Sequence, residues 1–374
     1  MRILYVCDAL AIYGGLERVL VDKANWLVEN GGYEVCLLTV NQGPHPICFP
    51  LHPNVLYNDL NIRFHQYSHL PFWKRVIKKR QLYHLFRKRL ARKIREEAPD
   101  IIICTRLGYV RAIVQVKGVI PLVFECHSSC LESRFEGDSM LRRIFNWYLM
   151  LAVRKVEMVV ALTNGDAGEW RKQTSNVCVI PNVVHLNNSG SYSDCMAKSV
   201  IFVGRFSRQK DISSLLHIWT HVYKSHPDWS LHIYGGYGEE QEMLFAEIKQ
   251  MNANIQVHEP TTDVIEKYKE NSILLLTSRF EPFGLVLPEA MSCGLPVVAY
   301  DCPYGPADII TDGIDGFLVR EGRCEEFVNK VCLLMEDGDL RFKMGEAGVE
   351  SSRRYSEGCI MPLWQQLFNQ LVKH

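Results

Sequence analysis

Short apolar runs alternate with longer helical patterns along the whole of this chain, and this alternation restricts the fold more than any other feature. The runs are rich in β-branched and aliphatic residues, which is typical of buried strands. The predicted strands are residues 2–7, 34–40, 55–60, 100–105, 122–127, 158–163 and 177–181, followed by 200–205, 230–235, 255–258, 273–278, 296–301 and 316–319. Strands that alternate with helices predict an α/β fold of parallel sheets covered by helices on both faces.

A polar stretch divides these strands into two series. Residues 184–197 are rich in Asn, Ser and Gly and lack apolar periodicity, as in a linker. A length of 374 residues also exceeds what one hydrophobic core usually supports. We therefore expect an N-terminal domain over residues 1–183 and a C-terminal domain over 198–354, with a last helix near 357–372 that could pack on either. Two doubly wound domains that face each other would bind a ligand in a central cleft, beyond the carboxyl ends of their strands.

The most informative segment is 278–296, where a buried strand leads through an acidic turn into a helix. Gly284 permits a sharp turn, and Pro288 is tolerated only in a first helical turn, so the helix is predicted to start near residue 285 or 287. Glu281 and Glu289 could each accept two vicinal hydroxyls, while the helix amides suit an anionic ligand. The alternative is that Glu281 caps the helix and Glu289 is solvated. The consistent strand, turn and helix pattern favours a site for a ligand with both sugar and phosphate.

A basic loop follows the first strand of the second series, over residues 203–211. Arg205 and Lys210 could converge on a diphosphate, because a guanidinium forks two oxygens and an ammonium acts as a mobile point charge. A basic loop of this kind is more often a solvated turn. The neighbouring acidic segment makes a diphosphate site the favoured interpretation.

Three other features follow strands in the same way. Gly14 and Gly15 open an amphipathic helix, where glycines permit close approach of a phosphate, although the full dinucleotide-binding spacing is absent. Gly235, Gly236 and Gly238 follow another predicted strand and could serve the same purpose. In both segments the alternative is that the glycines only form a turn and bind no phosphate. His127 ends a predicted strand and is a candidate to contact a sugar hydroxyl rather than a packed residue.

Charge is concentrated in one predicted helix. The chain has 42 basic and 42 acidic side chains, yet residues 74–95 include no acid. Their basic residues are Lys74, Arg75, Lys78, Lys79, Arg80, Arg87, Lys88, Arg89, Arg92, Lys93 and Arg95. Leu70, Phe72 and Trp73 are predicted to lie just before this helix. A basic amphipathic helix of this composition can lie on an anionic membrane surface, with Lys78, Lys79, Arg80, Arg87, Lys88 and Arg89 as its contacts. A solvated helix is the alternative. Nucleic acid is not expected as a partner, because no further motif supports it.

The cysteines and the N-terminus indicate a cytoplasmic protein. Thirteen cysteines are scattered without a CxxC pair or the Cys/His spacing of a structural zinc site, so we expect reduced thiols and no metal. Asp8 interrupts the apolar N-terminus, which predicts a first strand rather than a signal peptide. The longest apolar run, 145–153, is too short to span a bilayer. No recognisable nucleophile elbow is present.

With these residues assembled, the sequence resembles the retaining glycosyltransferases of family four, also called glycosyl transferases group 1, over essentially its whole length. Their GT-B fold has two facing Rossmann-like domains. The most specific part of the resemblance is the Glu-x7-Glu motif from Glu281 to Glu289. By this resemblance Glu289 would hold the ribose hydroxyls, and Glu281, with the backbone of Phe283, Gly284 and Leu285, would hold the transferred sugar.

Other roles follow from the same resemblance. Arg205 and Lys210 would bind the diphosphate, Gly15 would approach the phosphates, and His127 would contact the donor sugar. Residues 257–261, including His258, resemble the family's nucleobase-binding edge. Residues 355–374 would return to the N-terminal domain.

The resemblance also implies the reaction. Residues 301–306 resemble bacterial enzymes that build surface polysaccharides, often from UDP-hexoses, whereas Pro282 and residues 305–308 depart from the family pattern near the donor sugar. We expect retaining, metal-independent transfer of a hexose from a nucleotide-sugar to a glycan or lipid-linked glycan hydroxyl. The nucleotide-sugar is a substrate, so no cofactor is expected. The enzyme would be cytoplasmic or peripheral on the inner face of the plasma membrane. The alternatives are a GT-B nucleotide-sugar epimerase or phosphorylase, and a non-catalytic sugar-nucleotide-binding protein.

Overall fold

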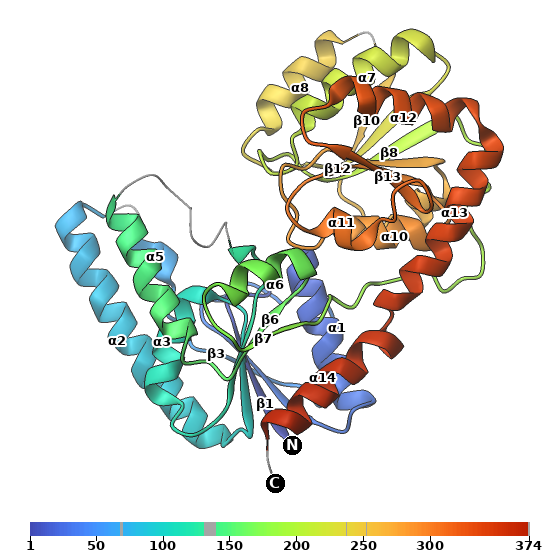
Figure 1. Cartoon of the computed structure of the whole chain (residues 1–374). Coiled ribbons are helices and arrows are strands. Elements are labelled where there is room, and N and C mark those ends of the chain that lie inside the picture. The colour runs from blue at the N-terminus through green and yellow to red at the C-terminus, as the bar shows by residue number, and fades with distance from the viewer. Residues whose placement is uncertain (68–69, 131–139, 237, 252, 373–374) are drawn as a thin grey trace. The chain divides into compact units, whose positions relative to one another are not determined.

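The computed structural model describes residues 1–67, 70–130, 140–236, 238–251 and 253–372. The chain forms two compact units. Unit 1 comprises Met1–Val183 and Met361–His374, and unit 2 comprises Val184–Ile360. Each unit is an α/β unit with its own parallel sheet and its own core, so the predicted fold class is confirmed (Figure 1).

The sheet of unit 1 has seven parallel strands in the order β3-β2-β1-β4-β5-β6-β7. The strands are β1 (Arg2–Cys7), β2 (Glu34–Thr39), β3 (Leu56–Asp59), β4 (Ile101–Cys104), β5 (Leu122–Glu125), β6 (Met158–Ala161) and β7 (Val177–Val179). The helices are α1 (Gly15–Glu29), α2 (Phe72–Glu97), α3 (Leu107–Val116), α5 (Met140–Val153), α6 (Asn164–Arg171) and α14 (Glu357–Leu371), with a 3-10 turn at Phe64–Tyr67. The part of α14 from Met361 onward belongs to this unit.

Helices cover both faces of this sheet, because successive strand residues point to opposite sides. Leu4 and Val6 of β1 share a core with Phe86 of α2, and the helices α2, α3 and α5 lie on that face (Figure 1). Tyr5 faces α1 on the other side, where α14 also lies. The ring of Phe368 in α14 packs edge-on against Tyr33, with centroids 5.8 Å apart.

The sheet of unit 2 has six parallel strands in the order β10-β9-β8-β11-β12-β13. The strands are β8 (Ser199–Arg205), β9 (Ser230–Gly236), β10 (Ile255–His258), β11 (Ile273–Leu276), β12 (Val297–Asp301) and β13 (Gly316–Arg320). The helices are α7 (Ile212–Ser225), α8 (Gln241–Gln250), α9 (Val264–Lys269), α10 (Val286–Ser292), α11 (Gly305–Ile309), α12 (Cys324–Glu336) and α13 (Gly338–Ser352), followed by a 3-10 turn at Arg353–Tyr355. Helices α7 and α12 pack on one face, while α10 and α11 lie on the other (Figure 1).

All thirteen predicted strands are present, and their ends differ from the predicted ends by at most two residues. Two details of the prediction are wrong. β5 ends at Glu125, so His127 lies in the following loop and does not end the strand. Phe72 and Trp73 lie inside α2, whose first residue is Phe72, because Pro71 serves as the N-cap residue. The stretch 184–197 that reads as a linker belongs to unit 2, where Ser193 and Cys195 are buried.

Candidate functional site

The strand order of unit 2 reverses between β8 and its neighbour β11. The connections that leave these two strands run in opposite directions across the sheet, which opens a crevice beyond their carboxyl ends. The loop after β8 contains Lys210, and the loop after β11 contains Glu281. The two segments that the sequence singled out therefore meet at the position where doubly wound sheets bind ligands.

Lys210 and Glu281 are in direct contact. The Lys210 ammonium donates a hydrogen bond to Glu281 Oε1, and their side chains are 14% and 5% exposed. The Ser278 hydroxyl donates to the same carboxylate oxygen at 2.7 Å. Two donors on one oxygen hold this nearly buried carboxylate in a fixed orientation.

The backbone around Glu281 is also fixed. Its N–H donates to the carbonyl of Pro303 at 2.7 Å, and its own carbonyl accepts from Tyr304 and Gly305 at 2.9 and 2.8 Å. Position 305 requires glycine, because a Cβ there would lie 1.8 Å from the Phe283 carbonyl oxygen. The loop of Glu281 is thus locked against the N-terminus of α11, and Phe283 is buried beneath it.

Arg205 lies at the carboxyl end of β8 and is exposed. Its guanidinium forms no hydrogen bond or ion pair with any residue in the described part of the chain. Neighbouring strands approach each other closely here, since a Cβ on Gly235 would lie 1.9 Å from the Gly204 carbonyl oxygen. The same end of the sheet therefore presents the exposed Arg205 guanidinium at the end of β8 and, in the loop that follows, the Lys210–Glu281 pair.

The helix α10 begins at Val286, between the two predicted starting positions, 285 and 287. Gly284, in the turn before it, has a positive φ of 94°, which glycine adopts readily. Leu285 is the N-cap residue, and no side chain caps the helix. Glu289 is half-buried in the first turn and accepts a hydrogen bond from the hydroxyl of the buried Tyr268 at 3.2 Å. Glu289 is therefore held in place rather than freely solvated.

His258 ends β10 next to two other rings, and its Nε2 is hydrogen-bonded to Nδ1 of His232 at 3.1 Å. It lies 4.4 Å from the Tyr234 ring with an interplanar angle of 12°, and 5.1 Å from the His232 ring at 9°. Burial, with a smaller effect from the Lys267 charge, lowers the pKa of His258, and burial also lowers that of His232. Both imidazoles are therefore neutral near pH 7, and the stack is a flat aromatic surface at the edge of the sheet.

In unit 1, Gly14 is the N-cap residue of α1 and Gly15 is its first residue. Gly14 has extended backbone geometry, and its carbonyl accepts the first helical hydrogen bond from Arg18 at 3.1 Å. A Cβ on Gly14 would lie 2.4 Å from the Glu17 carboxylate. An acidic group thus lies against Gly14, where the sequence predicted close approach of a phosphate.

His127 is nearly buried next to an internal ion pair. Its Nε2 lies 3.0 Å from Glu125 Oε1, and Glu125 in turn pairs with the Lys23 ammonium. Lys23 and Glu125 are 2% and 1% exposed, and the Lys23 ammonium lies 4.0 Å from the centroid of the Trp364 ring. Burial alone would raise the pKa of Glu125, but the charges and hydrogen bonds of Lys23 and His127 lower it to about 2. The carboxylate that faces His127 is therefore permanently charged at neutral pH.

Lys23 and Glu125 were not among the predicted functional residues. Both interrupt apolar patterns, since Lys23 follows Leu20 by three residues on the buried side of α1 and Glu125 ends the buried strand β5. A second missed group lies at the switch point between β1 and β4, where Asp8 pairs with Arg106 at 2.7 Å and accepts from the Tyr109 hydroxyl. A charged residue within a buried run is the signal that could have found both groups.

The basic face of α2 is mostly exposed. Lys78, Lys79, Arg80, Arg87 and Lys88 are all exposed, but Arg89 is half-buried and donates to the carbonyls of Leu60 and Asn61 at 2.5 and 3.0 Å. Arg89 is therefore partly engaged within the protein, unlike the other five predicted contacts, and its role at a membrane surface stays a prediction. Trp73 and Ile77 on the same helix are 77% and 58% exposed. Within the described residues, no helix combines the length and apolar composition needed to cross a membrane.

Comparison with known proteins agrees with this arrangement. The family model for glycosyltransferase family 4 matches residues 13–188, and the model for glycosyl transferases group 1 matches residues 193–351. The chain belongs to this glycosyltransferase family, and it is a glycosyltransferase. The amylovoran biosynthesis glycosyltransferase AmsD of Erwinia amylovora is 29% identical over 98% of this chain and 99% of its own length.

Solved structures show the same fold. A mutant of TarM from Staphylococcus aureus, in complex with fondaparinux, alpha-GlcNAc-glycerol and UDP, matches with a TM-score of 0.80 and 16% identity, over 98% of this chain and 99% of its own. Sucrose-phosphate synthase of Thermosynechococcus elongatus matches with a TM-score of 0.82 and 17% identity, over 99% of both chains. These neighbours establish the GT-B fold for this chain.

Proposed function

We propose that this glycosyltransferase moves a hexose from a UDP-hexose to a hydroxyl of a glycan or lipid-linked glycan, with retention at the anomeric carbon. The observation that carries the proposal is the buried Lys210–Glu281 pair beside the available Arg205 guanidinium at the switch point of unit 2. The named role of AmsD in amylovoran synthesis and the UDP bound to TarM support the acceptor and donor classes.

Unit 2 is proposed to bind the donor. Arg205 and Lys210 would bind the diphosphate, where each well-placed cation can lower the barrier by about 3 kcal/mol as negative charge grows on the leaving group. Glu281 and the backbone of Phe283, Gly284 and Leu285 would hold the hexose. Glu289, already oriented by a hydrogen bond, would accept from the ribose hydroxyls.

The ring stack at His258 suits a nucleobase. Stacking needs a flat ring face of fixed orientation, and His258 is fixed by its hydrogen bond to His232 and by its stacking on Tyr234. In unit 1, Gly14 and Gly15 would approach the phosphates, and His127 would hydrogen-bond a hydroxyl of the transferred sugar. The charge of Glu125 beside His127 would keep the imidazole in one orientation.

The proposed chemistry needs no covalent protein intermediate, metal ion or cofactor. The bond from the anomeric carbon to the diphosphate oxygen breaks as the acceptor oxygen bonds to the same face of that carbon. The acceptor proton passes to the departing phosphate oxygen. The protein's part is to fix the donor and to stabilise the charge of the diphosphate.

The test is product formation with a panel of nucleotide-hexoses, read by mass spectrometry, in wild type and Arg205→Ala. The expected result is a loss of kcat/KM of about 100-fold or more, as for removal of one preorganised donor. Arg208→Ala is the matched control, because Arg208 is exposed in the same loop and its guanidinium forms only a long ion pair with Glu240, at 3.8 Å. Near-normal kcat/KM in Arg205→Ala would refute the role of Arg205. Conversion of the donor sugar without any added acceptor would favour an epimerase, and phosphate-dependent formation of a sugar 1-phosphate would favour a phosphorylase. Donor binding without product would favour a non-catalytic protein.

We also propose that α2 places the enzyme on an anionic membrane surface. The exposed Trp73 and Ile77 lie on the same helix as the exposed Lys78, Arg80 and Lys88, which combines apolar insertion with electrostatic attraction. Binding to vesicles should rise with the fraction of anionic lipid and fall with added salt. Equal binding to neutral and anionic vesicles would contradict this proposal.

A further inference from the structure

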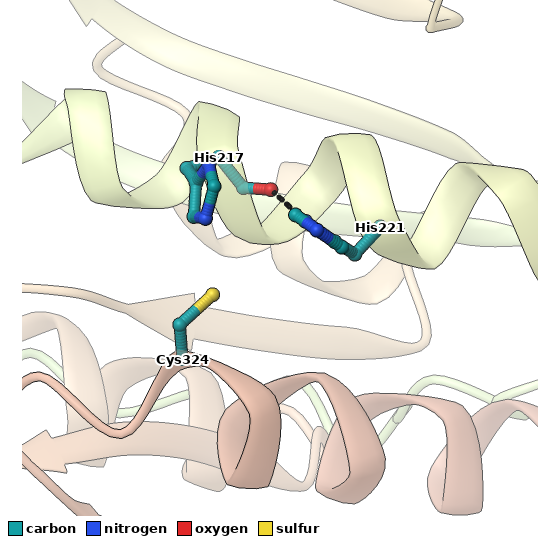
Figure 2. A group of neighbouring side chains, drawn as sticks. All are labelled: His217, His221 and Cys324. Carbon is teal, nitrogen blue, oxygen red and sulfur yellow. Dashed lines mark hydrogen bonds between the residues drawn. The ribbon is translucent and has the colours of Figure 1, made fainter.

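Two histidines and a cysteine meet on the face of unit 2 where α7 and α12 pack together (Figure 2). His217 and His221 are one turn apart on α7, and Cys324 is the first residue of α12. One ligand atom from each residue lies within 4.8 Å of the others. Both imidazoles are exposed, and the thiol is half-exposed, so an ion can reach all three from solvent.

The protonation pattern of His221 suits metal binding. Its Nδ1 lies 2.9 Å from the His217 carbonyl oxygen, and as the donor of this hydrogen bond it leaves the Nε2 lone pair available (Figure 2). Metal-bound histidines usually donate their other ring N–H in this way, which fixes the ring orientation. The two imidazole rings are 4.7 Å apart at an angle of 67°, so they converge without stacking.

The three ligand atoms would have to move only a short distance toward one another to bind one ion. Zinc–nitrogen bonds of about 2.0 Å and zinc–sulfur bonds of about 2.3 Å place tetrahedral ligand atoms about 3.3–3.6 Å apart. The observed separations of up to 4.8 Å close by about an ångström, within reach of side-chain rotation of three solvent-accessible residues. Burial raises the pKa of the Cys324 thiol, so the ion would displace its proton on binding.

We propose that His217, His221 and Cys324 form a site for Zn²⁺ or a similar borderline-soft divalent ion, with water as the fourth ligand. Two imidazoles and one thiolate favour such an ion over Mg²⁺ or Ca²⁺, which take oxygen ligands. The bound ion links α7 to α12 and stabilises unit 2. None of its three ligands belongs to the Lys210–Glu281 pair. Spacing along the chain could not indicate it, because Cys324 is far from the two histidines in sequence.

The test uses full-length protein stripped of metal by a chelator. Zn²⁺ is titrated in competition with a chromophoric chelator, and Co²⁺ is used as a spectroscopic probe. The wild type should bind one Zn²⁺ at this site, show a thiolate-to-cobalt charge-transfer band, and melt at a higher temperature with Zn²⁺. His217→Ala, His221→Ala and Cys324→Ser should each weaken Zn²⁺ binding at least ten-fold, since even an outer-shell partner contributes about that much.

Cys359→Ser is the matched control, because Cys359 is also a free thiol and is exposed on α14. It should keep the affinity, the charge-transfer band and the thermal shift of the wild type. Circular dichroism checks that each variant is folded. A charge-transfer band that survives in Cys324→Ser, unchanged Zn²⁺ affinity in His217→Ala, or no Zn²⁺ binding by the wild type would each overturn the proposal.

Discussion

Replacement of Lys23 by Met is expected to destabilise unit 1 far more than the loss of an ordinary surface ion pair. Lys23 and Glu125 are 2% and 1% exposed, so the substitution leaves a carboxylate buried without its ammonium partner. Breaking a buried pair from one side costs about 3–5 kcal/mol. Met fills a volume similar to the Lys stem, so the loss reflects charge rather than a cavity.

The assay is urea unfolding followed by fluorescence and by hydrogen exchange of α1 and β5 peptides. A loss of about 4 kcal/mol lowers the urea midpoint by about 2 M if the slope is about 2 kcal/mol per molar. Lys172→Met is the matched control, because Lys172 pairs with Glu169 on the surface of the same unit, where a pair contributes at most about 1 kcal/mol.

A double-mutant cycle measures the interaction energy between Lys23 and Glu125 apart from the effects of each side chain on its other neighbours. Lys23→Met combined with Glu125→Gln removes both charges, so the double variant should be more stable than the sum of the two single losses predicts, by about 2 kcal/mol or more. Additive losses, or a midpoint for Lys23→Met no lower than for Lys172→Met, would refute the reasoning that the pair is a buried, coupled unit.

The remaining predictions concern the loop of Glu281, the free energy of unfolding at low pH, and the removal of metal. Gly305→Ala should abolish most donor binding and destabilise unit 2 by about 1–3 kcal/mol, because the added Cβ would collide with the Phe283 carbonyl oxygen. Calorimetry measures the binding, and urea unfolding measures the stability. Gly108→Ala is the control: its Cβ has open space around it, so the substitution should be neutral or mildly stabilising. The depressed pKa of Glu125 contributes stability that is complete above its ordinary pKa of 4.5 and is lost as pH falls toward about 2. The stability advantage of wild type over Glu125→Gln should therefore shrink by about 1.4 kcal/mol per pH unit below pH 4.5, and a constant difference would contradict that protonation scheme. Chelation should lower the melting temperature of the wild type but not of Cys324→Ser, and should leave the turnover of both unchanged at 25 °C; lost turnover would show that catalysis needs a metal.

Much of the arrangement at the switch point of unit 2 followed from local sequence. Gly284, with its positive φ, and Pro288, inside α10, fixed the turn and helix that carry Glu289. Lys210 and Glu281 were each identified separately, since both follow strands of one parallel sheet. Their direct pairing was not predicted, because it depends on β8 and β11 being neighbours although β9 and β10 lie between them in sequence.

Arg89 shows how a local pattern can mislead. Its place among eleven basic residues indicated a membrane-facing charge, yet it donates to the carbonyls of Leu60 and Asn61 beside β3. Helical periodicity gives the face of a residue within its own helix. It does not give the loop from elsewhere in the chain that packs against that face.

The sequence alone determined the alternation of strands and helices, the two parallel sheets, the family and the loops that hold Arg205, Lys210, Glu281 and Glu289. These properties depend on residue spacing over a few turns or strands, where hydrophobic periodicity and turn chemistry act. Only the tertiary structure decided which distant groups meet: Lys23 with Glu125 and His127, and His217 with Cys324. Such contacts arise when packed helices and strand order bring remote segments together, and no local pattern encodes that proximity.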